Sequence, residues 1–138
     1  MTYASPYTVT VTSTAGGLAH CTYTDASGAV VPAGQRLTTS TPEGQPGALQ
    51  FNFTESQSLR LVGAVVKTVG NDPTLNPYNY LGATRDVETL LDVVTVPWGV
   101  DLYTVRGVVL MFAKVDDNGD MLNFFPSSDP QVQNTDGD

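Results

Sequence analysis

Basic residues, histidine and cysteine are all scarce in this sequence. Six Lys or Arg residues stand against 14 Asp or Glu residues, and the formal net charge is −8 at pH 7. A nucleic-acid binder needs a basic surface to neutralise phosphates, and anionic membranes attract basic segments, so we expect neither partner. The basic residues are also scattered along the chain, at Arg36, Arg60, Lys67, Arg85, Arg106 and Lys114.

The single cysteine and the single histidine exclude further classes of site. One cysteine, Cys21, cannot form a disulfide within the chain, and with His20 as its only histidine companion it cannot build a zinc site. The two residues are adjacent, and neighbouring side chains of a strand point to opposite faces. They therefore cannot act together as a nucleophile and its base.

Long hydrophobic runs are missing as well. The longest, residues 108–113, is far shorter than the ~20 residues that cross a bilayer. The first residues lack the basic and apolar regions of a signal peptide. We therefore expect a cytoplasmic protein without a membrane partner.

What the sequence does contain is typical of strands and turns. Hydrophobic residues make up 41% of the 138 residues and charged residues only 14%, which favours one globular domain, 1–138, with a substantial core. Residues 7–12, 49–54 and 59–69 alternate between apolar and polar side chains, the period of a half-buried strand. In the last of these segments Gly63 suggests a bulge.

Two segments deviate from this simple alternation. Residues 86–96 combine helical spacing of apolar residues with the β-branched run at 93–96, so we expect a short helical turn that leads into a strand. Residues 108–113 are apolar at every position, which is typical of a strand covered on both faces. The outward side chains of this strand would be Val109, Met111 and Ala113.

The stretch 116–138 contains six carboxylates and no basic residue. Asp116, Asn118 and Asp120 resemble the first ligands of an EF-hand, but the required glycine and glutamate positions are Met121 and Ser127. Asn118 followed by glycine instead predicts a hairpin with a type I′ turn. We expect no metal or cofactor, and an acidic, loosely ordered tail at 126–138.

Together these patterns predict an all-β fold. The spacing favours an immunoglobulin-like β-sandwich of seven to eight short antiparallel strands, with at most one short helix near 85–92.

A candidate binding site comes from aromatic and amide side chains in two loops. Tyrosine and tryptophan rings beside amides are typical of sugar or peptide sites, because the rings offer apolar area and the amides fix orientation. Rings that only pin their loops to the sandwich are the structural alternative. The residues of this candidate site are Tyr78, Tyr80, Trp98, Asn76 and Asn79.

No catalytic residues are predicted. Glycosidases need two carboxylates at a suitable separation. The candidate carboxylates are Asp86, Glu88, Asp92 and Asp101, and nothing in the sequence singles out a pair. We expect no enzymatic activity.

The last forty residues show one family resemblance. A long apolar strand passes through Asp-Asn-Gly-Asp into Leu-Asn-Phe-Phe-Pro-Ser-Ser-Asp-Pro-Gln-Val-Gln-Asn, which resembles the bacterial DP-EP family. Asp129-Pro130 would be the first of its two dipeptides, whereas this chain contains no Glu-Pro pair. The resemblance implies a compact β-rich fold and no functional site.

The predicted function is that of a small acidic interaction or structural module without enzymatic activity. The alternative is a small-ligand or carbohydrate-binding domain that uses the aromatic residues of the 70–83 loop and Trp98. An apolar strip on the outer face of 108–113, extended by Leu122 or Phe124, would be covered either by residues 86–96 of the same chain or by a second copy. With a second copy we expect a two-fold dimer.

Overall fold

The computed structural model describes residues 3–32, 35–39, 47–54, 58–69, 79–97, 105–127 and 131–134. Most of them lie in strands, and the described part contains one three-residue 3-10 helix, η1 (Ala15–Gly17). The strands are β1 (Tyr3–Ser13), β2 (His20–Thr24), β3 (Leu37–Thr39), β4 (Gly47–Thr54), β5 (Leu59–Val69), β6 (Asn79–Gly82), β7 (Thr84–Asp86), β8 (Leu91–Pro97), β9 (Val105–Val115), β10 (Met121–Pro126) and β11 (Gln131–Asn134).

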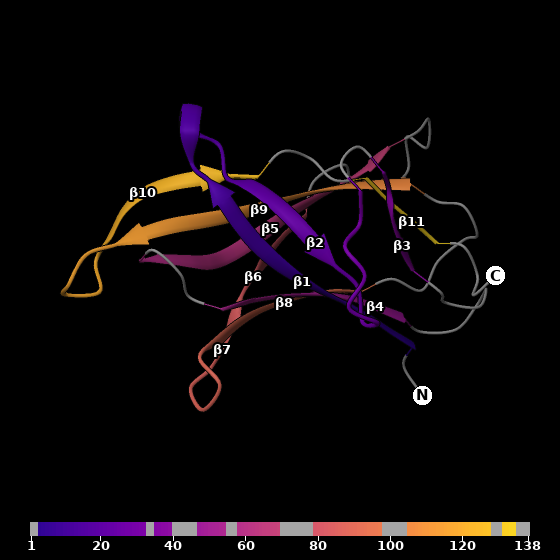
Figure 1. Ribbon diagram of the computed structural model, residues 1–138, viewed down its shortest axis with the longest axis horizontal. Coiled ribbons are helices and arrows are strands. Elements are labelled where there is room, and N and C mark those ends of the chain that lie inside the picture. Colours follow the sequence, from indigo (N-terminus) through magenta and orange to yellow (C-terminus); the bar gives the residue numbers. More distant parts are fainter. Residues whose placement is uncertain are drawn as a thin grey trace.

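The strands form two sheets that pack as a sandwich (Figure 1). The first sheet has the order β2-β1-β4-β8-β7, and the second has the order β3-β11-β9-β5-β6. Strand β11 pairs with residues 105–107 at the start of β9, and β10 pairs with residues 111–115 at its end. Strand β11 uses residues 131–134 of the segment expected to be an acidic tail, where it pairs with β3 and β9.

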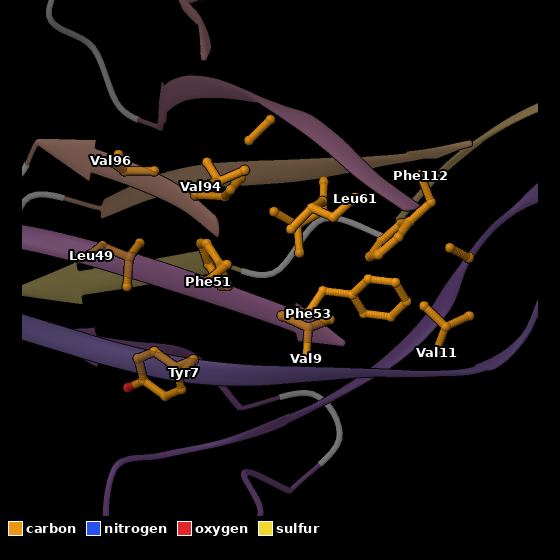
Figure 2. Packing of buried hydrophobic residues seen from close by; sticks show 14 of the residues in the cluster. Tyr7, Val9, Val11, Leu49, Phe51, Phe53, Leu61, Val94, Val96 and Phe112 are labelled. Carbon is orange, nitrogen blue, oxygen red and sulfur yellow. The ribbon is translucent and has the colours of Figure 1, made fainter. Parts of the chain in front are cut away.

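Apolar side chains at every second position of the strands fill the core between the sheets. In β4, Leu49, Phe51 and Phe53 are buried while the intervening Gln50 and Asn52 are half-buried. Figure 2 shows such side chains from both sheets meeting in one cluster. The rings of Phe53 and Phe112, one from each sheet, lie 5.0 Å apart at 73°, the edge-to-face arrangement that aromatic pairs favour.

The predicted all-β sandwich is confirmed, but the strand inventory differs. The described part contains eleven strands rather than seven or eight. Two pairs are parallel, β1 with β4 and β3 with β11, so the fold is not wholly antiparallel. Parallel neighbours need long connections, and period-two patterns do not reveal which distant strands will meet.

No helix forms near 85–92, and the short helical turn expected there is a single turn, in which the Leu90 amide donates to the Asp86 carbonyl at 2.8 Å and after which β8 begins. Strands β7 and β8 are joined there by a four-residue turn, and Val87 and Leu90 are 79% and 51% exposed. Leu90 has a φ of 59°, which ends any right-handed helical path. The β-branched run that follows forms β8, with Val94 and Val96 in the core.

The turn at 116–120 is a hairpin turn, although not of type I′. Gly119 has a φ of 84°, whereas Asn118 does not share the positive φ that type I′ demands. The Gly119 amide donates to the Asp116 carbonyl and the Asp116 amide donates to the Asp120 carbonyl, both at 3.0 Å. This is the three-residue hairpin in which a glycine bulge follows a type I turn. The turn at 25–29 has the same two hydrogen bonds.

Candidate functional site

The structure describes only part of the predicted aromatic site. Tyr78, Trp98 and Asn76 lie outside the described residues. Asn79 begins β6, and its side chain lies outside the described part as well. Tyr80 is on β6 with 64% of its surface exposed. Convergence of these aromatic residues on one surface therefore stays a prediction.

Tyr80 packs closely against the backbone of β5. A Cβ atom added at Gly63 would lie 2.5 Å from Tyr80 Oη and 2.7 Å from Tyr80 Cζ. The Tyr80 hydroxyl is 3.4 Å from the Val62 carbonyl, to which it donates. The register of β5 shifts between Leu61 and Gly63, so the bulge predicted at the glycine is present. Gly63 thus makes room for an exposed aromatic ring.

The outward side chains of β9 are partly covered within the chain itself. The register places Tyr80 beside Val65 and Val65 beside Val109, and it places Met111 beside Gly63. Val109 and Met111 are half-buried, and Ala113 is fully buried. The outward side chains of β9 therefore form a modest strip rather than a fully exposed one.

The exposed apolar residues gather on β10 instead. Met121, Leu122 and Phe124 are 52%, 55% and 56% exposed. In Figure 1, β9 and β10 form a hairpin whose turn projects at the far left of the molecule. Phe125 differs, because it is half-buried and packs against the core.

One edge of β10 is unpaired among the residues described here. Its inner edge pairs with β9, from Met121 to Pro126. In the described part, η1 lies near β10, and the outer edge has a hydrogen bond to another segment at its end, where the Ala19 amide donates to the Pro126 carbonyl at 2.9 Å. We call the outer side of residues 121–125 the β10 edge. At the edge of a sheet the outward backbone groups of a strand have no partner strand, and here the exposed side chains beside them are apolar.

A buried carboxylate joins the two sheets at another place. Asp92 on β8 is 1% exposed, and its Oδ1 accepts hydrogen bonds from Arg60 Nη2 at 2.9 Å and Arg85 Nη1 at 3.1 Å. Its Oδ2 accepts from Arg60 Nε at 2.9 Å and from the Leu61 amide at 3.0 Å. Arg60 and Leu61 belong to β5 of the opposite sheet. Both carboxylate oxygens are thus committed to holding the sheets together.

Sequence reasoning named Asp92 only as one of several scattered carboxylates. The available signal was its position in β8, where an acid takes the place that alternation with Val94 and Val96 reserves for an apolar residue. A buried acid requires charged or hydrogen-bonding partners, so such a position predicts an ion pair. The partners themselves are distant in sequence.

The other predicted carboxylates have separate positions. Asp86 accepts hydrogen bonds from the Glu88 and Thr89 amides in the exposed β7–β8 turn, and these bonds lower the pKa of its carboxyl. Glu88 is exposed in the same turn. Asp101 lies outside the described residues. In the described ranges, no three His, Cys, Asp or Glu side chains come together as a metal-binding group.

His20 and Cys21 have different partners, as expected from neighbours on a strand. His20 Nε2 lies 3.0 Å from the Ala15 carbonyl, and Cys21 Sγ lies 3.6 Å from the Ala19 carbonyl. Burial raises the pKa of the Cys21 thiol to about 11, although a hydrogen bond with Tyr23 opposes the shift. Cys21 is therefore protonated at neutral pH and a poor nucleophile.

No family model matches the chain, and no curated protein matches it. Within the described part, the structure has no helix with the length and apolar character needed to span a bilayer.

Proposed function

We propose that this protein is a non-enzymatic interaction or structural module that associates with itself as a dimer. The observation that carries the proposal is the concentration of exposed apolar side chains on β10, where Met121, Leu122 and Phe124 are all more than half exposed. Monomeric proteins rarely leave contiguous apolar patches in water.

Charge supports a second copy meeting this part of the surface. The chain carries a net charge of −8, so most of its surface repels another copy. Residues 121–127 contain no charged side chain. Two copies that meet there bury apolar area without burying carboxylates, which would otherwise require partners.

Light scattering coupled to size exclusion tests the proposal. We expect a mass between monomer and dimer that rises with protein concentration. Phe124→Lys should lower the dimer fraction, because it places a charge in the patch. The matched control is Thr95→Lys, at an exposed position of β8 in the other sheet. A monomeric mass for the wild type at all concentrations would reject the proposal.

A ligand-binding function is the second candidate, favoured by Tyr80. Its ring is 64% exposed and is supported by the glycine beneath it, an arrangement that suits stacking of a sugar or another flat apolar surface. Trp98, Tyr78, Asn76 and Asn79 would complete this site. A glycan array, followed by titration of Trp98 fluorescence, tests it with Tyr80→Ala as the control. Unchanged binding by that variant would exclude Tyr80 from any site found.

Three further expectations accompany the proposal. A cytoplasmic location is consistent with a single cysteine, which leaves the chain without an internal disulfide. An immunoglobulin-like relationship is suggested by the two packed sheets. Membership of the DP-EP family is suggested by Asp129-Pro130 and the hairpin before it.

A further inference from the structure

One pair of residues in the turn between β9 and β10 is chemically reactive. Asn118-Gly119 is the only Asn-Gly pair in the sequence. Both residues are exposed, in the turn that projects from the molecule in Figure 1. The backbone nitrogen of the residue after an asparagine can attack the side-chain carbonyl carbon of that asparagine, and glycine hinders this approach least because it has no side chain. The pair therefore combines exposure with the sequence best suited to this attack.

The reaction is a deamidation. The Gly119 nitrogen forms a bond to Cγ of Asn118, and the bond between Cγ and the side-chain nitrogen breaks. That nitrogen leaves as ammonia, with the proton that the Gly119 nitrogen has lost, and a five-membered succinimide ring remains. Water then opens the ring at either carbonyl, which gives aspartate or isoaspartate. Water is the only co-reactant, and either product adds one negative charge to the turn.

Hydrogen bonds of the folded turn oppose this attack. The Gly119 amide donates to the Asp116 carbonyl at 3.0 Å. The nitrogen must give up this bond and its proton before it can reach Cγ of Asn118. The Asp116 carboxylate also holds the peptide groups on both sides of the glycine, since its Oδ1 accepts from the Asn118 and Asp120 amides at 2.9 Å each. Asp116 therefore keeps the turn closed through both its main chain and its side chain.

The turn at 25–29 has the same arrangement, with a serine in place of the asparagine. The Gly28 amide donates to the Asp25 carbonyl at 3.0 Å. Asp25 Oδ1 accepts from the Ser27 amide at 2.9 Å and from the amide two residues further on at 3.0 Å. Gly28 and Gly119 have similar φ angles of 89° and 84°. Serine has no side-chain carbonyl for the glycine nitrogen to attack, so this turn is an unreactive counterpart of the other.

We propose that Asn118 is a site of spontaneous deamidation in the folded protein, at a rate that the hydrogen bonds of Asp116 control. A closed turn withholds the Gly119 nitrogen and an open turn releases it, so the rate follows the fraction of molecules in which the turn is open. Exposed turns open at a lower free energy than core strands do. One net hydrogen bond changes such an equilibrium by a factor of roughly five. This modification does not depend on self-association.

Peptide mapping by mass spectrometry tests the proposal. Folded wild-type protein is incubated at pH 8, and each asparagine is followed for the mass increase that accompanies conversion of an amide to a carboxyl group. We expect Asn118 to be modified before any other asparagine of the chain. Asp116→Ala should accelerate this modification at least about fivefold, because it removes both hydrogen bonds of the carboxylate. Asn118→Ser is the matched control and should fold, because Ser27 has the equivalent position in the other turn.

A second variant keeps the test decisive if circular dichroism shows that Asp116→Ala does not fold. Ser27→Asn places an Asn-Gly pair in the 25–29 turn, and we expect modification there at a rate similar to that at Asn118. The proposal is rejected if Asn118 is modified only after unfolding in urea. It is also rejected if folded Asp116→Ala reacts no faster than the wild type, or if position 27 of folded Ser27→Asn stays unmodified while Asn118 reacts.

Discussion

Replacement of Asp92 should destabilise the sandwich more than any other single loss of charge in its described part. The carboxylate is 1% exposed and accepts hydrogen bonds from two arginines and the Leu61 amide. Breaking a buried ion pair costs about 3–5 kcal/mol. The side chains of Arg60 and Arg85 are 28% and 22% exposed and can regain water when the carboxylate is lost. We therefore expect Asp92→Ala to lower the free energy of unfolding by about 3 kcal/mol. At this chain length that corresponds to a melting temperature roughly 10 °C lower.

The Asp92→Asn variant separates charge from hydrogen bonding. Its amide oxygen can still accept from Leu61, so we expect a smaller loss of about 2 kcal/mol. Glu88→Gln is the matched control, because it removes one negative charge from an exposed turn, and its effect should be within about 0.5 kcal/mol. Urea unfolding followed by circular dichroism gives these differences. A loss below about 1 kcal/mol for Asp92→Ala would show that the ion pairs do not hold the sheets together.

Four further results are expected. Gly63→Ala should lower the free energy of unfolding in urea by about 1–3 kcal/mol, because the new methyl group would lie 2.7 Å from the Leu81 carbonyl oxygen of β6. Gly82→Ala is the control and should not lower it in this way, because the space around Gly82 is open. Leu90→Gly should raise stability by about 0.5–1 kcal/mol, since glycine accepts the φ of 59° without strain; a loss would mean that the exposed leucine packs usefully. The native Cys21 thiol should react slowly with a disulfide reagent at pH 8 and rapidly in urea. Because its native pKa is raised from 9.0 to about 11, the stability it contributes is present below pH 9 and falls as the pH rises towards 11, and Cys21→Ala should flatten that decline. Millimolar calcium should leave the melting temperature unchanged, since the 116–120 turn has an incomplete set of ligands; a clear rise would contradict the hairpin interpretation.

The sequence predicted local features of this protein well. Alternation identified the buried faces of β1 and β4, because one side of each strand contacts a single core. The pair Asn118-Gly119 located a hairpin turn, although the type of turn depends on φ angles that the two residue names leave open. Gly63 correctly marked a bulge.

Short apolar segments were the least predictable. Val87 and Leu90 have helical spacing, yet both side chains face solvent in a turn. Spacing shows which residues would share a helix face, but not whether a core lies opposite that face. The pairing of β7 with β8 gave these residues a different environment.

The sequence alone therefore determined the fold class, the alternating core faces and the acidic, cysteine-poor composition, since each depends on residue type and on neighbours close in the chain. Only the tertiary structure decided the parallel pairings, the partners of Asp92 and, among the residues that it describes, the unpaired edge of β10. Arg60 and Asp92 are separated by 32 positions in the chain, and no local pattern connects them. Their meeting depends on how two sheets pack, which is a property of the whole core.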